Sequence, residues 1–219
     1  MNRPFTDRRD AGRQLADRLS TWAGRDDVVV LALPRGGVPV AFEVATALHA
    51  PLDVLPVCKV GMPWQPELAL GALSSNGAQY VDQALAREAG ITPSRLENEL
   101  EDAREELARR EARYRGSRAP VPVAGRVAIV VDDGLATGAS LKAATLALAS
   151  LRPARIVAAL PVAPMDAERR VGDAVDELAC VQKPLSFMSV GQFYADFGQT
   201  SDAEVSELLE RAAGRFAPR

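Results

Sequence analysis

Short runs of nearly continuous hydrophobic residues recur along the chain. They are DDVVVLALP, PLDVLPVCKV, GRVAIVVDD, ARIVAALPVAP and VDELACVQ, at 26–34, 51–60, 125–133, 154–164 and 175–182. Such runs are typical of strands that are buried on both faces of a parallel sheet. Segments with helical spacing follow several of them, among them 38–50 and 140–153. The alternation predicts an α/β fold, with a Rossmann-like, mainly parallel sheet of five strands flanked by helices.

Other patterns predict elements around this sheet. Residues 5–24 have the spacing of one amphipathic helix, and a C-terminal helix is expected over about 202–214. Residues 68–81 suggest a hairpin that turns at Asn76-Gly77, because this dipeptide favours tight turns between strands.

A long charged helix is predicted over 92–115. Its start is capped by Thr92 with Pro93 or by Ser94 with Glu97. Its apolar positions form one stripe, made by Leu96, Leu100, Ala103, Leu107 and Tyr114. The plain interpretation is a solvated helix that packs by one face, and a partner-binding helix is the alternative.

Composition limits the class of protein. The chain has 219 residues, 47% of them hydrophobic and 25% charged, which is ordinary for one globular domain. A net charge of −3 and the lack of a basic cluster argue against a nucleic-acid partner. No apolar run reaches the roughly 20 residues of a membrane span, and no signal sequence is recognised. Cys58 and Cys180 are interpreted as reduced core thiols of a cytoplasmic protein.

Unusual residues follow several of the predicted strands. They are Arg35-Gly36-Gly37, Lys59 and Asp132-Asp133-Gly134. Lys59 is one of only three lysines in the chain. In open parallel sheets, ligands bind at the carboxyl ends of the strands, so we expect these residues to border a common site.

The segment 132–140 combines an acid pair with a loop suited to an anion. Gly134 and Gly138 allow backbone N–H groups to converge, and the helix that follows directs its positive end to the same place. The spacing does not match a Walker A loop. Two carboxylates would repel a phosphate, so they are expected to face neutral donors or a cation. A ligand with a phosphate at one end and a diol in its middle satisfies both halves.

The stretch VAIVVDDGLATGAS, 127–140, resembles the phosphoribosyl pyrophosphate signature of the type I phosphoribosyltransferases. The resemblance implies that Asp132 and Asp133 bind ribose hydroxyls. It implies that the 5-phosphate is bound by Gly134, Leu135, Ala136, Thr137, Gly138, Ala139 and Ser140. The plainer interpretation is a sheet end with a solvated acid pair and a glycine turn.

Two other segments extend the resemblance. In LALPRGG, 31–37, the loop of Arg35, Gly36 and Gly37 corresponds to the family's pyrophosphate loop, where a non-proline cis peptide is expected around Pro34 to Gly36. CKVGMPWQPELALGAL, 58–73, resembles the family's mobile loop, with Lys59 as its basic residue. A lid over about 60–75 would exclude water, and Glu67 is a candidate contact on it.

The tail KPLSFMSVGQFYADFGQTSDAEV, 183–205, resembles that of a bacterial group in this family. It implies a hood of about 183–200 together with the N-terminal segment, beside a core of about 25–165 in a single domain, 1–219. Phe187 is a candidate for stacking on an acceptor base, or else belongs to the hood core. Phe193 and Tyr194 are expected in that core.

The implied reaction transfers phosphoribose from 5-phosphoribosyl 1-pyrophosphate to a nitrogen acceptor such as a nucleobase. Asp132, Asp133, Lys59 and Arg35 are the expected catalytic residues, and the expected cofactor is Mg²⁺. The cation is expected to be held mainly by the substrate, with Asp132 and Asp133 as further candidates. Ala136 stands where the hypoxanthine-guanine branch has an acid, so that branch's acid/base arrangement is not expected.

Other functions remain open on the residues alone. A non-catalytic regulatory protein could use the same site to sense the donor, and a pyrophosphohydrolase could cleave it. A receiver-like phosphoacceptor domain also has paired acids. In that class the acids follow the first strand, whereas in this sequence they follow the third predicted strand. The residues identify neither the acceptor nor a general base, and they leave a homodimer open.

Overall fold

The computed structural model describes residues 3–62, 65–74, 77–116, 118–173 and 175–215. Its α-helices are α1 (Arg8–Arg18), α2 (Gly37–Leu48), α3 (Gln83–Glu88), α4 (Pro93–Arg115), α5 (Ala139–Ala149), α6 (Ala167–Val171) and α7 (Asp202–Arg215). Its strands are β1 (Val28–Ala32), β2 (Leu52–Val54), β3 (Val57–Met62), β4 (Gln65–Ser74), β5 (Gln79–Val81), β6 (Val127–Val131), β7 (Arg155–Val162) and β8 (Glu177–Gln182). Short 3₁₀ turns occur at Ser20–Trp22 and Val190–Phe193.

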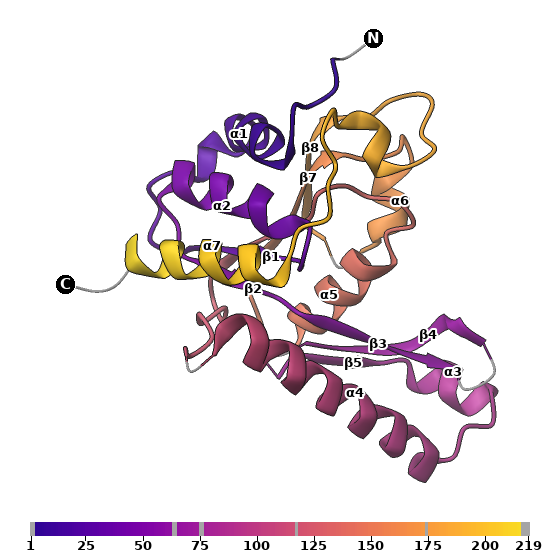
Figure 1. The fold of residues 1–219 in the computed structure, drawn as a ribbon. Coiled ribbons are helices and arrows are strands. Elements are labelled where there is room, and N and C mark those ends of the chain that lie inside the picture. The colour runs from indigo at the N-terminus through magenta and orange to yellow at the C-terminus, as the bar shows by residue number, and fades with distance from the viewer. Residues whose placement is uncertain (1–2, 63–64, 75–76, 117, 174, 216–219) are drawn as a thin grey trace.

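The main sheet has five strands in the order β2-β1-β6-β7-β8, and each neighbouring pair is parallel (Figure 1). All residues of β1 and β6 are buried, as their unbroken apolar runs predict. The predicted α/β class with a parallel five-stranded sheet is therefore confirmed.

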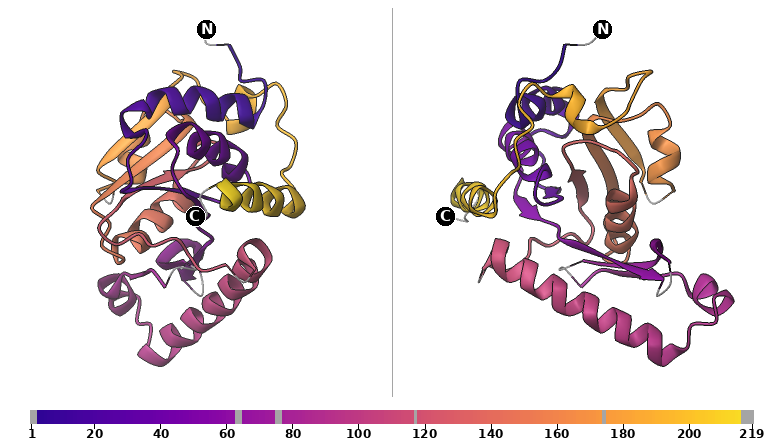
Figure 2. Two further views of the ribbon diagram at one scale, coloured as in Figure 1. Left: turned by 90° about the vertical axis from the view of Figure 1, so that its left-hand side faces the viewer. Right: turned by 45° about the vertical axis from the view of Figure 1, so that its right-hand side comes forward.

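Helices cover both faces of this sheet (Figures 1 and 2). On one face α1, α2 and α7 pack on the side chains of Val28, Val30 and Ala32, while on the other face α5 and α6 pack around Val29 and Leu31. Alternate residues of β1 thus enter opposite cores. The carboxyl ends of β1 and β6 lie side by side at one edge of the main sheet.

A second sheet, antiparallel and in the order β3-β4-β5, lies between α4 and α5. The expectation of one strand over 51–60 is wrong, since β2 and β3 belong to different sheets. Pro56 lies between them and lacks the N–H that a continuous strand would need. The hairpin over 68–81 is confirmed as the β4–β5 pair, with Gly77 at φ 77°, whereas Asn76 lies outside the described residues.

The segment expected to form a lid, 60–75, consists mainly of β3 and β4 where it is described. Its apolar side chains, including Val60 and Leu70, pack against the stripe of α4. The other side of the sheet packs on α5, through Ala72 and Ala143. A closing motion of this segment stays a prediction.

The N-terminal segment pairs with the C-terminal tail. Phe5 forms a parallel bridge with Tyr194, and the Phe5 N–H donates to the Phe193 carbonyl at 2.8 Å. The expectation of one helix over 5–24 is therefore too simple, because Phe5 is extended and α1 begins only after the Asp7 cap. Short helices α3 and α6 were not predicted. No helix in the described part of the chain combines the length and apolarity needed to cross a membrane.

Candidate functional site

Two loops meet at the carboxyl ends of β1 and β6. Residues 33–36 follow β1, and 132–138 follow β6. A Cβ added at Gly36 would overlap the Asp133 carboxylate, and one added at Gly37 would lie 2.7 Å from the Val131 carbonyl oxygen. The backbone of Gly36 therefore lies against the Asp133 carboxylate and that of Gly37 against the end of β6, an approach that a side chain at either position would hinder. The peptide bond between Pro34 and Arg35 is cis, as the resemblance to the family implies.

Both loops present backbone donors that the protein leaves free. Among the described residues, the N–H groups of Arg35 and Gly36 in one loop donate to no protein acceptor. The same holds for Ala136, Thr137 and Gly138 in the other loop. Free N–H groups in two adjoining loops can bind anionic oxygens.

The β6 loop leads directly into α5. Gly138 has φ 82°, a left-handed conformation that suits glycine, and it places Ala139 at the first position of the helix. The carbonyl of Ala136 accepts a hydrogen bond from Arg170 at 2.6 Å, so it is turned away from the free N–H groups. Thr137 and Ser140 are exposed at the same helix end. This end can bind a phosphate through both its free N–H groups and its dipole.

Asp132 and Asp133 lie beside this anion loop and are largely removed from water. Burial, reinforced by the charge of Asp133, raises the pKa of Asp132 well above its ordinary value. Burial also raises the pKa of Asp133, although the Arg8 guanidinium opposes this shift. The Asp133 N–H donates to Asp132 Oδ1 at 2.9 Å and so fixes one carboxylate against the next residue. Because the two carboxylates are poorly solvated, they gain free energy when hydroxyl groups donate hydrogen bonds to them.

Arg8 is a site residue that the sequence reasoning missed. Its Nε donates to Asp133 Oδ2 at 2.9 Å, and its Nη1 donates to the Gly198 carbonyl at 2.6 Å. The guanidinium lies 4.0 Å above the Phe197 ring. The contact with Asp133 spans 125 positions, and Arg8 is one of many arginines, so no local pattern distinguishes it.

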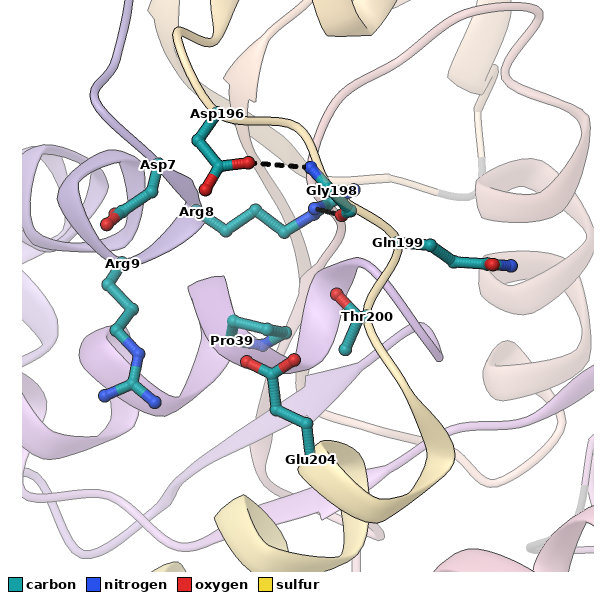
Figure 3. A pocket seen from close by; sticks show the side chains of 9 residues that line it. All are labelled: Asp7, Arg8, Arg9, Pro39, Asp196, Gly198, Gln199, Thr200 and Glu204. Carbon is teal, nitrogen blue, oxygen red and sulfur yellow. Dashed lines mark hydrogen bonds between the residues drawn. The ribbon is translucent and has the colours of Figure 1, made fainter.

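The Arg8 contacts join α1 and the C-terminal tail to the acid pair. Figure 3 shows Arg8 extended toward Gly198, at the wall of a hollow of about 260 Å³ between α1 and the tail. Tyr194, which also comes from the tail, donates its hydroxyl to the Asp133 carbonyl at 2.5 Å. Both termini of the domain therefore position Asp133.

Arg35 and Lys59 lie in different places. Arg35 lines a hollow with the C-terminal half of α4 and with Asp202. Lys59 is exposed on β3 and lines another hollow, of about 340 Å³, together with Ala139 and Lys142. The structure thus brings Gly36, Asp132 and Asp133 together, whereas Arg35 and Lys59 line two different hollows.

The aromatic side chains of the C-terminal tail mainly contact one another and Phe5. The rings of Phe187 and Phe193 stack with centroids 5.4 Å apart, and Tyr194 packs on Phe5 at 5.3 Å. Phe187 remains partly exposed, so both of its expected roles are compatible with its position. The side chain of Glu67 lies outside the described residues.

The residues fit Mg²⁺ only in a supporting role. The described part of the chain contains no group of three or more His, Cys, Asp or Glu side chains that could hold a metal. Asp133 already forms an ion pair with Arg8, so Asp132 and Asp133 could supply only part of the coordination shell of a metal ion. A hydrated cation that carries phosphate oxygens matches this donor set.

Comparisons with known proteins support one family. The model of the phosphoribosyl transferase domain matches residues 7–197. Two Mycobacterium tuberculosis proteins, from strains CDC 1551 / Oshkosh and H37Rv, are each 46% identical over 213 residues and bear the name "Putative phosphoribosyl transferase". Each match covers 97% of this chain and 48% of the relative, so the chain spans about half of the relatives' length.

A crystal structure shows the same fold. That of TT1426 from Thermus thermophilus is 42% identical in sequence to this chain, with a TM-score of 0.86. The match covers 95% of this chain and 98% of TT1426. The agreement therefore extends over nearly the whole length of both chains.

Proposed function

Because this chain belongs to the phosphoribosyl transferase domain family, we propose that it transfers phosphoribose from 5-phosphoribosyl 1-pyrophosphate to a nitrogen acceptor and releases pyrophosphate. The observation that carries the proposal is the pair of adjoining loops: among the described residues, their N–H groups without a protein acceptor flank two half-buried carboxylates. A donor with phosphates at both ends of a ribose diol complements this layout. The proposed setting is the cytoplasm.

Each part of the donor has a proposed partner. The N–H groups of 136–138 and the hydroxyls of Thr137 and Ser140 bind the 5-phosphate. Asp132 and Asp133 accept hydrogen bonds from the ribose hydroxyls. The loop of Arg35 and Gly36 binds the pyrophosphate, for which its free N–H groups and guanidinium are suited. Hydrogen bonds from the ribose hydroxyls replace those that the two carboxylates lose when they are shielded from water. No other group of the ligand offers such donors.

The reaction breaks the bond between C1 and the pyrophosphate oxygen and forms a bond between C1 and the acceptor nitrogen. Positive charge develops on the ribose, so the adjacent carboxylates stabilise the transition state. Mg²⁺, when bound, neutralises charge on the leaving pyrophosphate. Lys59, from β3, is proposed to approach the same group when the β3–β4 hairpin closes and excludes water. Beyond these charge effects, the protein is proposed to accelerate the reaction by holding the donor and the acceptor in position.

Calorimetry with 5-phosphoribosyl 1-pyrophosphate and Mg²⁺ tests the donor site. We expect saturable binding by the intact protein and at least a tenfold loss in the double variant Asp132→Asn with Asp133→Asn. The matched control is Asp17→Asn, an exposed acid on α1, which should bind like the unchanged protein. Unchanged affinity in the double variant would refute the assignment of the acids to the diol.

A screen for pyrophosphate release tests catalysis. The protein is incubated with donor and Mg²⁺ and with each nucleobase in turn, and pyrophosphate is measured. Release that depends on one base supports the transferase and identifies its acceptor class. Donor binding without release on any base would instead support a regulatory donor-binding protein, and release with no acceptor a pyrophosphohydrolase.

A further inference from the structure

A hollow rich in arginine lies beside the β1 loop, outside the signature segment. It has a volume of about 440 Å³ and is bordered by Arg35, by the C-terminal half of α4, and by Asp202 at the start of α7. Figure 1 shows the end of α4 beside α7, which brings together segments that lie far apart in the sequence. We refer to it as the arginine hollow; its cations are Arg35, Arg109, Arg110 and Arg113.

The charges that line the arginine hollow do not balance. Four guanidinium groups and two carboxylates, Glu106 and Asp202, line it. Glu105, which is not among the lining residues, lies 3.8 Å from Arg109, so the excess is one positive charge. The two carboxylates that line the hollow each already serve two cations. Glu106 binds Arg109 at 2.9 Å and Arg110 at 2.8 Å, and Asp202 binds Arg113 at 3.0 Å with Arg35 3.9 Å away. Most guanidinium N–H donors therefore remain available to an additional anion.

Arg35 is the least satisfied of the four. Its separation from Asp202 exceeds hydrogen-bond distance, and among the described residues its side chain donates to no acceptor. Its backbone N–H is free as well. Asp202 is instead held by Arg113 and by the hydroxyl of buried Tyr114, at 2.9 Å, so it cannot move to Arg35 without breaking these bonds.

The N-terminal half of α4, up to Arg104 at its middle, shows how charges are paired on a solvated helix face. There Arg104 binds two carboxylates, Glu97 at 2.7 Å and Glu101 at 3.0 Å. There one cation has two acids of its own, whereas the four cations of the arginine hollow share three acids, Glu105, Glu106 and Asp202. Pairs within a helix account for Arg104 but leave the excess charge in the hollow unexplained.

We propose that the arginine hollow binds a condensed phosphate chain of two or more phosphates. Guanidinium forks match pairs of phosphate oxygens, and four neighbouring guanidinium groups with unused donors suit a ligand with several phosphate oxygens rather than a single carboxylate. The proposal goes beyond the donor site, because three of the four cations come from α4. The phosphate chain could be the pyrophosphate end of the donor or part of a separate effector. The experiment separates these two sources.

Calorimetry with inorganic tripolyphosphate, without Mg²⁺, provides the test. We expect the double variant Arg109→Ala with Arg113→Ala to bind it at least tenfold more weakly than the unchanged protein. Arg104→Ala, on the same helix, is the matched control and should leave the affinity unchanged. Circular dichroism and the melting temperature establish that each variant is folded, and Arg110→Ala gives a second disruption of the hollow if the double variant does not fold.

Equal tripolyphosphate affinity in the unchanged protein and in these hollow variants would overturn the proposal, as would no binding by the unchanged protein. The test is independent of the proposed function, because Asp132→Asn with Asp133→Asn should still bind tripolyphosphate. If the hollow variants also lose donor affinity, the hollow holds the donor's pyrophosphate. If donor affinity is unchanged while tripolyphosphate binding falls, the hollow serves a separate phosphate-rich effector.

Discussion

Asp132 and Asp133 illustrate how single residues can be placed at a cost to stability. Both carboxyl groups are shielded from water at the end of β6, and burial raises both pKa values. An acid whose pKa is raised on folding binds protons more tightly in the native state than when unfolded. Its contribution to the free energy of unfolding is therefore greatest at low pH and is lost as the pH rises through the raised pKa.

Replacing Asp132 by Asn should make the protein more stable and less able to bind the donor. The neutral amide avoids the desolvated charge and can still accept from the Asp133 N–H, so we expect a gain on the order of 1 kcal/mol at neutral pH. Urea unfolding from pH 4 to 8 should show the gain shrinking toward low pH, where Asp132 is protonated. Asp17→Asn is the control, and a loss of stability at neutral pH would contradict the argument.

The raised pKa of the acids also predicts how donor binding varies with pH. The ionised carboxylate is the stronger acceptor for ribose hydroxyls. Donor affinity should therefore fall as the pH is lowered through the raised pKa of Asp132, at a higher pH than an ordinary aspartate, near 3.9, would require. Calorimetry across this range checks the midpoint; a midpoint at or below the ordinary value would refute the assignment.

The Arg8 guanidinium partly neutralises the negative charge of the Asp133 carboxylate. Its removal in Arg8→Met leaves the Asp133 carboxylate shielded without a cation, and we expect a loss of a few kcal/mol in the free energy of unfolding together with weaker donor binding. Arg8→Lys should be intermediate, since an ammonium cannot span both Asp133 and the Gly198 carbonyl as the guanidinium does.

Urea unfolding and donor calorimetry measure the Arg8 variants. The control is Arg9→Met in the same turn of α1, because Arg9 makes no ion pair among the described residues. Equal effects of Arg8→Met and Arg9→Met would show that the contact with Asp133 does not matter.

At the scale of elements, local patterns determine most helices and strands but not their partners. Thr92 caps α4 with Pro93 at its first position, as one of the two predicted caps requires. The apolar run at 51–60 satisfies the criteria for a strand throughout, yet β2 and β3 join different sheets. Sheet membership depends on which strands come alongside, and this information is absent from the run itself.

One buried ion pair ties α4 to the main sheet. Arg115, with a side chain only 2% exposed, donates to both oxygens of Asp53 on β2, at 3.2 and 3.1 Å. Asp53 also accepts from the N–H groups of Val54 and Val121. The pair fixes the end of the helix that presents Tyr114 and Arg113 to the arginine hollow.

Arg115→Met should lower the free energy of unfolding by about 3–5 kcal/mol, because it leaves the Asp53 carboxylate buried without its cation. Arg104→Met on the exposed part of the same helix should cost less than about 1 kcal/mol. Urea unfolding of both variants provides the comparison. Similar losses in the two would mean that the buried pair does not anchor α4.

On the scale of the whole molecule, the candidate site depends on distant segments. The β1 loop, the β6 loop, α1 and the C-terminal tail all converge on Asp133. Phe5 is fully buried and pairs with the tail, so the N-terminal segment is an integral part of this arrangement. A ligand that bridges the loops should therefore stabilise the folded domain as a unit.

Donor with Mg²⁺ should raise the melting temperature. At a donor concentration of 100 times the Kd, linkage predicts about 2.7 kcal/mol of stabilisation. For a domain of this size, that corresponds to a shift of roughly 5–10 °C. Differential scanning calorimetry measures the shift, Mg²⁺ alone is the control, and the variant Asp132→Asn with Asp133→Asn should show little change. No shift at saturating donor would contradict binding to the folded state.

The sequence alone determined the fold class, the main strands, and the segments that form the β1 and β6 loops, because continuous apolar runs and glycine-rich turns are local signals. Only the tertiary structure decided the strand order, the separation of Arg35 from Lys59, the contact of Arg8 with Asp133, and the arginine hollow. These features join residues tens to more than a hundred positions apart. Their chemistry depends on burial and distance, which arise only when the chain has folded.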